Sequence, residues 1–338
     1  MPIGWGILGT GSLAKNHMGP AIGKALDTKL VAVCDVRLDV AQEFARKNGV
    51  ERAYDSLEKM LEDPEIEVLL IATPNNQHAE QTLRAAEAGK HVLCEKPMAL
   101  TEGDCERMIE ACEKYNVKLG VDFQNRYHPA HLEARRLIQS GAAGEINVAE
   151  AKYCRGAFRG FNKGWRIDPR IAGAGALMGQ GLHPIDLLRF LLNSEVREVR
   201  ALTDEAPPLR PIDDMNYIIL TFDNETHGVV ISGILAPRPD NDAVLYGDKA
   251  KITCKGTVGM WLRGDLVVEG DSFNMRMTFP FSDSPELYIR VVEDFNRCIL
   301  ENTKPEISGE NGLQMVRITN AILESSRQGK AVRIARRL

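Results

Sequence analysis

The sequence has no long hydrophobic run. No window approaches the roughly 18 consecutive apolar residues that a membrane-spanning helix needs. A charged leader is missing as well, because the N-terminus runs directly into a strand-like segment at residues 3–8. These two absences favour a cytoplasmic protein that has no membrane partner.

The cysteines form no recognisable framework. There are seven, they are scattered along the chain, and no two of them make a C-x-x-C pair. This pattern excludes a disulfide scaffold and a zinc site of the usual spacing, so we expect reduced thiols in the core. His183 and Asp186 have no third partner at a recognisable ligand spacing, and we therefore expect no metal.

An excess of positive charge is missing too. The chain carries 42 Lys and Arg against 47 Asp and Glu, which gives a net charge of -5. Proteins that bind nucleic acid usually present a concentrated basic face. We therefore expect no nucleic-acid partner.

The chain is long enough for two domains. Its 338 residues exceed what one hydrophobic core usually supports, since about 150 residues per domain is common. Residues 1–122 alternate short apolar runs with helical patterns, which is typical of an α/β domain with a parallel sheet. Residues 123–338 are richer in alternating β-formers, which predicts an α+β domain with a mainly antiparallel sheet.

Short apolar runs bounded by turn signals mark the expected strands. In the first domain we predict strands at residues 3–8, 30–34, 68–72, 91–94 and 118–121. In the second domain we predict strands at residues 146–153, 217–222, 227–234 and 243–246.

Caps and breakers mark the expected helix ends. Ser56 is a candidate N-cap, and Thr101 with Asp104 matches a capping box. Pro20 should shorten or kink the first helix, because it has no N–H and clashes with the preceding turn. In the second domain we predict helices at residues 131–139, 182–192, 286–300 and 312–327.

A glycine-rich loop of the form G-x-G-x-x-A follows the first predicted strand and opens the first helix. Gly9 permits the tight turn, Gly11 lets the backbone approach a pyrophosphate, and the helix N-terminus favours the phosphate charge. Ala14 is small enough for close helix packing. A plain strand-to-helix turn is the alternative interpretation. The residues that we expect at the cofactor are Gly9, Thr10, Gly11, Ser12, Leu13 and Ala14.

A carboxylate strengthens the cofactor interpretation. Asp35 ends the second predicted strand, about 20 residues beyond the loop, where it can accept hydrogen bonds from ribose hydroxyls. A carboxylate there also repels a 2′-phosphate, so we predict NAD as the cofactor. Arg37 keeps NADP open, because a guanidinium can pair with that phosphate.

Two further segments come directly after predicted strands. They lie at the carboxyl ends of parallel strands, where ligands bind in open α/β sheets. Taken alone, they would also fit a turn and a surface lysine. The residues that we expect to add to the cofactor site are Thr73, Pro74, Asn76, His78, Glu95 and Lys96.

At this point the chain resembles the family of glucose-fructose oxidoreductase, inositol dehydrogenase and their relatives, the Gfo/Idh/MocA family. The resemblance rests on the G-x-G-x-x-A loop, T-P-x-x-x-H at 73–78, E-K-P at 95–97, G-x-G-x-L at 173–177 and G-x-H-x-x-D at 181–186. It implies a Rossmann domain followed by a domain with a large open sheet that often makes a homodimer or homotetramer. It also implies NAD(P) as cofactor and sugars, polyols or related compounds as substrates.

The resemblance assigns catalytic roles by position. Lys96 resembles the family lysine that touches both the nicotinamide and the reacting oxygen, and Pro97 resembles the proline, often cis, that helps to fix it. His183 resembles the His, or Tyr in some members, that exchanges the hydroxyl proton. These roles suit the chemistry, because a lysine ammonium stabilises a developing alkoxide and an imidazole titrates near neutral pH.

The chain departs from the family pattern at Gly179. Members with a catalytic carboxylate usually carry Asp four residues before the His, so here the proton relay is incomplete or rerouted. Asp186 lies three residues after His183 on the same helix face, and we predict that it orients the imidazole. The alternative is a carboxylate that interacts with the helix dipole. Gln180 offers a hydrogen bond without charge.

We expect substrate contacts from a loop at residues 156–170 that combines aromatic rings with hydrogen-bonding groups, as sugar recognition requires. Packing between the domains is the alternative role for these rings. The loop includes Phe158, Arg159, Phe161 and Asn162. The residues predicted to touch substrate are Arg126, Trp165, Arg166, Gln180 and His183.

The combined prediction is an NAD(P)-dependent oxidoreductase. It transfers a hydride between the nicotinamide and a sugar, a polyol or a related carbohydrate-derived alcohol or ketone. A non-catalytic NAD(P)-binding regulator or sensor of the same fold is the alternative, which Gly179 keeps open. The presence of both Lys96 and His183 favours the enzyme.

Overall fold

In the computed structural model, which describes residues 1–157, 163–204 and 211–335, the chain forms two units. Unit 1 comprises Met1–Gln124 and Pro285–Val316, and unit 2 comprises Asn125–Ser284 and the chain from Arg317 onward. We predicted one boundary after residue 122, with all later residues in the second domain. The structure differs, because a late segment of the chain packs with unit 1.

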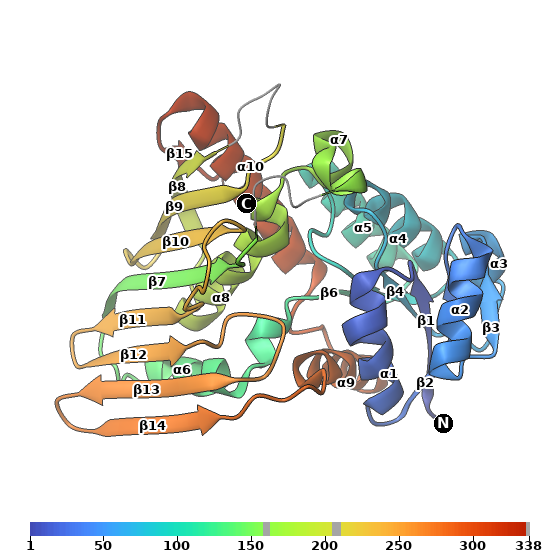
Figure 1. Ribbon diagram of the computed structural model, residues 1–338, viewed down its shortest axis with the longest axis horizontal. Helices are drawn as coiled ribbons and strands as arrows, with labels where there is room; N and C mark the ends of the chain where they lie inside the picture. The colour runs from blue at the N-terminus through green and yellow to red at the C-terminus, as the bar shows by residue number, and fades with distance from the viewer. Residues whose placement is uncertain (158–162, 205–210, 336–338) are drawn as a thin grey trace. The chain divides into compact units, whose positions relative to one another are not determined.

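Unit 1 contains a parallel sheet (Figure 1). Its strands are β1 (Ile3–Leu8), β2 (Thr28–Cys34), β3 (Arg52–Tyr54), β4 (Val68–Ile71), β5 (His91–Cys94) and β6 (Leu119–Val121). Among the described residues the order is β3-β2-β1-β4-β5-β6, and neighbouring strands pair in parallel. This is the strand order of the Rossmann fold, so the predicted α/β class is confirmed. The sequence prediction missed β3, whose three residues are all half-buried and show no alternation.

Unit 1 also contains helices and helical turns, most of which connect these strands. They are η1 (Ala14–Met18), α1 (Gly19–Lys24), α2 (Leu38–Asn48), α3 (Leu57–Leu61), η2 (Asn75–Gln77), α4 (His78–Glu87), α5 (Glu102–Lys114) and, later in the chain, α9 (Glu286–Leu300). Ser56 and Thr101 accept hydrogen bonds from backbone N–H groups at the starts of α3 and α5, which confirms both predicted caps.

The first helix, which we expected Pro20 to shorten or kink, changes its type directly before Pro20. It begins with an α-helical turn at Ser12 and Leu13, in which the N–H of Lys15 donates to the carbonyl of Gly11. It then passes through one turn of π-helix, η1, in which the N–H of Gly19 donates to the carbonyl of Ala14, and continues as α1. Pro20 stands directly after this π-turn, in the first turn of α1, within a helical run that is continuous from Ser12 to Lys24.

The core of unit 1 lies on both faces of the sheet. All residues of β1 and of β4 are buried, as expected for parallel strands that helices cover on both sides. Helix α1 packs against α2 and α9, and α4 packs against α5. Helix α9 is the element that we had placed in the second domain. The indole N–H of Trp5 in β1 donates to the Asn296 side chain (3.0 Å), and the Trp5 ring meets Phe295 edge-on. An amphipathic pattern predicts such a helix but does not identify the sheet that it covers.

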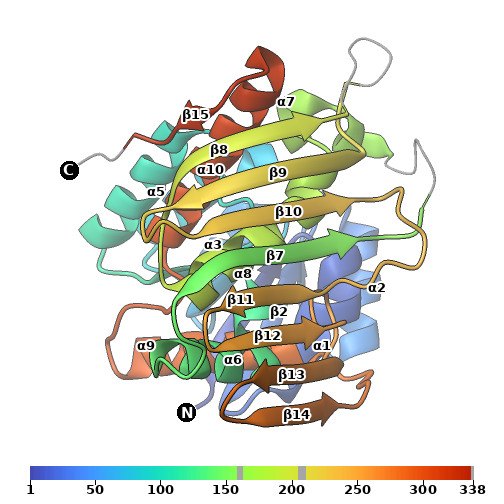
Figure 2. The same ribbon diagram turned by 90° about the vertical axis from the view of Figure 1, so that its left-hand side faces the viewer.

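Unit 2 contains a mixed sheet, which faces the viewer in Figure 2. Its strands are β7 (Ile146–Cys154), β8 (Val196–Thr203), β9 (Met215–Phe222), β10 (His227–Gly233), β11 (Ala243–Gly247), β12 (Ala250–Lys255), β13 (Gly264–Gly270), β14 (Asn274–Phe279) and β15 (Val332–Arg333). Among the described residues the order is β14-β13-β12-β11-β7-β10-β9-β8-β15, and only β7 and β10 pair in parallel. The predicted mainly antiparallel sheet is confirmed.

Helices cover one face of this sheet. The helical elements are η3 (Gln124–Tyr127), α6 (Pro129–Gln139), η4 (Gly164–Ile167), α7 (Pro169–Ala172), η5 (Leu177–Gly181), α8 (Leu182–Leu192) and α10 (Gly309–Gln328), whose first residues belong to unit 1. Every residue of α8 is buried, and this helix packs against β7 and β10, while α6 packs against β12 and β13 (Figure 2). None of the helices in the described part of the chain is long and apolar enough to cross a membrane.

Candidate active site

Three carboxyl strand ends lie side by side in unit 1. Leu8 at the end of β1 pairs with Ile71 at the end of β4, which in turn pairs with Cys94 at the end of β5. The segments that follow these strands therefore share one edge of the sheet, the edge at which open α/β sheets bind ligands. This register brings the loop from Gly9, the segment from Thr73 and Lys96 to the same edge.

The two glycines of the loop have different surroundings. Gly9 has a φ of 95°, and a Cβ on it would lie 2.7 Å from the carbonyl oxygen of Ala72. A Cβ on Gly11 would meet no atom within 4 Å. The turn itself therefore requires glycine at position 9, whereas position 11 leaves backbone open to a ligand, as a pyrophosphate needs.

The rest of the loop runs into the π-turn. Ser12 is exposed and Leu13 half-buried, whereas Ala14 is fully buried where the helix packs closely. The Asn16 side chain donates to the Ser12 hydroxyl (3.1 Å). The helix thus begins with an α-helical turn at Ser12 directly after the loop, and the π-turn η1 follows it.

The Asp35 carboxylate is hydrogen-bonded to the glycine-rich loop through Thr10. Its Oδ2 atom accepts hydrogen bonds from the backbone N–H and the hydroxyl of Thr10, at 3.1 and 2.8 Å, and its Oδ1 accepts from the N–H of Arg37. A carboxylate has about four acceptor positions, so these three bonds leave room for a ribose hydroxyl. The Arg37 side chain is exposed.

His78 has a different setting from the predicted one. We placed it at the cofactor, but it is fully buried, and its ring nitrogens contact the carbonyl oxygens of Pro97 (2.8 Å) and Thr73 (3.0 Å). Burial lowers the pKa of His78. The imidazole thus ties the two strand-end segments to each other. Of its companions in the prediction, Pro74 is half-buried and Asn76 exposed.

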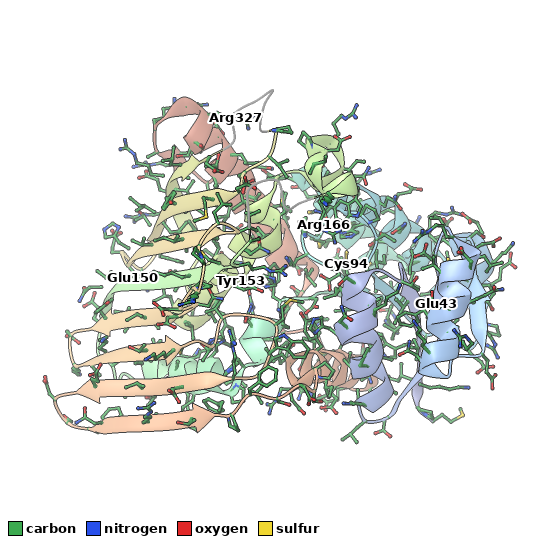
Figure 3. The ribbon with its side chains drawn as sticks, in the orientation of Figure 1. Glu43, Cys94, Glu150, Tyr153, Arg166 and Arg327 are labelled. Carbon is green, nitrogen blue, oxygen red and sulfur yellow. The ribbon has the colours of Figure 1, made fainter. Side chains whose placement is uncertain are left out.

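Lys96 directly follows Glu95 at the end of β5 and is joined to Pro97 by a cis peptide bond. Figure 3 labels Cys94, the last residue of this strand. The side chain of Glu95 lies against Asp122, the residue that follows β6. We did not single out Asp122 from the sequence, although a carboxylate at a carboxyl strand end is the signal by which we selected Asp35.

In unit 2, a buried carboxylate anchors the glycine-rich segment before α8. Asp213 accepts hydrogen bonds from the N–H groups of Gly175 and Leu177, both at 2.7 Å, and from the Asn216 side chain at 2.8 Å. Burial raises the pKa of Asp213. The sequence prediction missed this residue, because Asp213 lies 38 positions along the chain from Gly175 and 36 from Leu177, and no local pattern links them.

His183 stands in the first turn of α8 and is buried. Its ring meets the ring of Tyr153 edge-on, with 5.6 Å between centroids, and Figure 3 labels Tyr153 near the end of β7. Gln180 belongs to η5, a second π-turn, directly before this helix, and is also buried. A Cβ on Gly179 would meet no atom within 4 Å, so the structure leaves room for a first side-chain atom at this position.

Asp186 is engaged by arginines. Arg126 donates to both of its oxygens, at 2.8 and 2.6 Å, and Arg189 donates to Oδ1 at 3.3 Å. Arg189 also makes two bonds to the Glu195 carboxylate. We predicted that Asp186 orients His183 and that Arg126 touches substrate. The structure instead pairs these two residues with each other, and both are buried.

The described part of the predicted substrate loop is mostly exposed. Trp165 is half-buried, and the Arg166 guanidinium lies 4.4 Å from the centre of its ring. Phe158, Arg159, Phe161 and Asn162 lie outside the described residues. Within the described ranges, no group of three or more His, Cys, Asp and Glu side chains is placed to hold a metal ion.

Both halves of the chain match models of known protein families. Residues 3–123 match a model described as an oxidoreductase family with an NAD-binding Rossmann fold, and residues 131–253 match the GFO/IDH/MocA C-terminal domain.

Individual relatives match over most of their length. The chain is 30% identical to an uncharacterized oxidoreductase of Rhizobium meliloti, covering 86% of this chain and 78% of that protein. It is 27% identical to 1,5-anhydro-D-fructose reductase of Ensifer adhaerens, covering 98% of each. Among solved structures, levoglucosan dehydrogenase in complex with NADH and levoglucosan matches with a TM-score of 0.88 at 26% identity, covering 99% of this chain and 100% of that chain.

Proposed function

This chain belongs to the Gfo/Idh/MocA family of NAD(P)-dependent oxidoreductases, and we propose that it transfers a hydride between NAD and a carbohydrate-like alcohol or ketone. One observation carries the proposal: Lys96 follows β5 at the sheet edge that also carries the Gly9 loop. An ammonium group beside a dinucleotide site stabilises the alkoxide that forms as the hydride moves.

The proposed acid/base is His183. A hydride leaves a carbinol carbon as the hydroxyl proton is taken up, and an imidazole suits this exchange near neutral pH. The edge-on contact with Tyr153 supports this role by fixing the ring. We assign Asp186 to the support of α8, since two guanidinium groups engage its carboxylate. Gln180, next to the space at Gly179, is the proposed partner of a substrate hydroxyl.

The proposed cofactor is NAD rather than NADP. Asp35 supports this choice, because its carboxylate would face a 2′-phosphate with like charge. The measurement is kcat/KM for the two coenzymes, with Asp35→Ser as the variant. The original chain should prefer NAD, and Asp35→Ser should narrow the preference by about tenfold or more. A clear preference of the original chain for NADP would contradict the assignment.

The proposed substrate is a sugar, an anhydrosugar, a sugar acid or an inositol. One relative is named for the reduction of 1,5-anhydro-D-fructose, and another was solved with levoglucosan, which supports this range. Trp165 and Arg166 are the described loop residues proposed to contact it, because a ring stacks on C–H faces and a guanidinium binds hydroxyls.

The protein is further proposed to be cytoplasmic and to form a homodimer or homotetramer. The sheet face of unit 2 that α6 and α8 leave uncovered supports self-association. It exposes large apolar side chains on adjacent strands, and a contiguous apolar patch marks an interaction surface. These side chains are Val148, Leu202, Tyr217, Ile219, Val229 and Tyr246.

A thermal-shift screen with NAD present tests the function directly. A bound sugar should raise Tm in proportion to RT ln(1 + [L]/Kd), and the compounds that do so should then drive NADH formation. Tight NAD binding without NADH formation from any sugar or polyol would favour the non-catalytic regulator instead.

A further inference from the structure

The acidic side chains of Glu95 and Asp122 lie against each other in unit 1, and Lys96 directly follows Glu95. Cys94 at the end of β5 is the sheet partner of Val121 at the end of β6, so Glu95 and Asp122 follow at the same level. The N–H of Asp122 donates to the carbonyl of Cys94 at 2.9 Å, which holds the two strand ends together. Both carboxyl groups are therefore placed by the register of two buried parallel strands.

Each carboxyl has one backbone donor. The N–H of Lys96 donates to Glu95, and the N–H of Gln124 donates to Asp122. The Oε1 atom of Glu95 and the Oδ1 atom of Asp122 are buried and meet no donor group among the described residues. Yet the two side chains are close enough to share a hydrogen bond. Two carboxylates are both acceptors, so this contact requires a proton.

The electrostatics agree with that requirement. Burial, followed by the charge of Asp122, raises the pKa of Glu95 well above its usual value, and burial raises the pKa of Asp122 to about 6. Lys96 is the cation that opposes both shifts. Two other titratable groups lie beside this segment: burial raises the pKa of the Cys94 thiol and lowers that of His78, so both are neutral at pH 7.

We propose that Glu95 and Asp122 share one proton and present a single negative charge to Lys96, which keeps the lysine an ammonium while it acts on the substrate oxygen. Asp122 is then a positioning residue that acts through Glu95. Without the shared proton, the pair would either carry two like charges in a buried site or leave one buried oxygen unsatisfied. The shared proton stands on unit 1 alone, whereas the effect on Lys96 rests on the proposed function.

Infrared difference spectroscopy of the whole protein tests the proton. A protonated carboxyl has a carbonyl stretch that carboxylates and imidazoles lack, and its loss can be followed against pH. The original chain should show two coupled steps, with one proton retained at pH 7. Asp122→Asn and Glu95→Gln should each leave one step, and in Asp122→Asn its midpoint should lie at least about one pH unit below the later step of the original chain.

Asp242→Asn is the matched control, since Asp242 is a half-buried carboxyl of unit 2 whose pKa burial raises. This variant should lose the carbonyl band of the Asp242 carboxyl, and the two coupled titration steps of Glu95 and Asp122 should remain unchanged. No retained proton at pH 7 in the original chain, or the same two steps in Asp122→Asn, would overturn the shared proton. If Asp122→Asn does not fold, Glu95→Gln tests the pair from the other side.

The pH profile of turnover tests the effect on Lys96. The alkaline limb of the kcat profile, where Lys96 loses its proton, is the readout. Each single variant keeps one carboxyl able to carry the negative charge, so the midpoint of this limb should stay within a few tenths of a pH unit of the original. The double variant Glu95→Gln/Asp122→Asn has no such charge, and its alkaline limb should move to lower pH by about one unit or more. An unmoved limb in the double variant would overturn the effect on Lys96. Absence of turnover with every sugar would refute the proposed function, while the infrared result would still decide the shared proton.

Discussion

Around Asp186 in unit 2, the negative charges of buried carboxylates are neutralised by arginine side chains. Around Glu95 in unit 1, neutralising the carboxyl charges requires a proton as well. Asp186 meets Arg126 and Arg189, and Arg189 also meets Glu195, so two carboxylates face two guanidinium groups. In unit 1 two acids face the single cation of Lys96. A network balanced by ions keeps its charges over a wide pH range and suits structural support. A network balanced by a proton changes with pH and suits chemistry.

Removing the carboxylate charge of Asp186 from its network with Arg126 and Arg189 should have the largest effect on stability. Asp186→Asn leaves two buried guanidinium groups without their shared carboxylate, and we expect a loss of about 3–5 kcal/mol in the free energy of unfolding. Urea denaturation followed by tryptophan fluorescence measures it. The control is Asp168→Asn, which alters a carboxylate paired with the exposed Arg170 and should cost less than about 1 kcal/mol. Similar losses in the two variants would break the comparison.

Lys96→Met should affect turnover rather than stability. Removing the ammonium group removes stabilisation of the alkoxide, so kcat should fall by about 10²–10³-fold. Calorimetric titration should show NAD affinity retained. Lys114→Met, at the exposed end of α5, is the control and should keep both properties. Near-normal turnover of Lys96→Met would refute the assignment of this lysine.

Asp122→Asn should stabilise the protein at alkaline pH. Burial raises the pKa of Asp122 from 3.8 to about 6, so the native state keeps a proton that the unfolded chain has already released. This contribution to stability is complete below about pH 4 and is lost as the pH rises through about 6. Asn cannot ionise, so the variant should gain about 1–3 kcal/mol at pH 8 and little at pH 4.

Thermal unfolding at the two pH values measures this difference. Asp271→Asn, which alters an exposed carboxylate, is the control and should show no such trend. A variant that is less stable than the original at pH 8 would mean that Asp122 is held as a stabilised carboxylate, like Asp186.

The last comparison concerns the free energy of unfolding after alanine substitution at two glycines, Gly175 and Gly179, in the segment that leads into α8. A Cβ on Gly175 would lie 2.1 Å from the carbonyl oxygen of Asp213, whereas one on Gly179 would meet nothing within 4 Å. Gly175→Ala should therefore cost about 1–3 kcal/mol. Gly179→Ala should be neutral or stabilise by up to about 1 kcal/mol, because alanine favours the helical backbone. Equal losses in the free energy of unfolding, measured with denaturant, would mean that neighbouring atoms enclose Gly179 as closely as Gly175.

Much of the fold followed from local patterns. The buried strands β1, β4 and β5 read as short apolar runs, and the caps at Ser56 and Thr101 are local hydrogen bonds that a few adjacent residues specify. In unit 2 the strands β8, β12, β13, β14 and β15 were not predicted. Strand β14 is mostly exposed, so it lacks the alternation that marks a half-buried strand.

The candidate site was predictable where a motif is contiguous, as in the loop from Gly9 to Ala14. It was not predictable where a contact depends on tertiary register. Asp122 meets Glu95 only because β5 and β6 are neighbours, and Asp186 meets Arg126 across 60 positions of sequence. The spacing of His183 and Asp186 suggested a partnership, but a guanidinium offers a carboxylate two parallel hydrogen bonds, which an imidazole cannot match.

The two π-turns, η1 and η5, each take up one additional residue near the start of a helix. A π-turn accommodates one residue more than an α-turn, and one residue of an α-helix corresponds to a rotation of about 100°. Deleting a single residue from Leu177–Gly181 would let the turn relax to α-helix and leave the preceding segment facing nearly the same way relative to α8, whereas an α-helix that kept every residue would rotate it. The same applies to Ala14–Met18 and the cofactor loop before it. At both places the π-turn takes up one additional residue and so preserves the direction in which the preceding segment enters the helix.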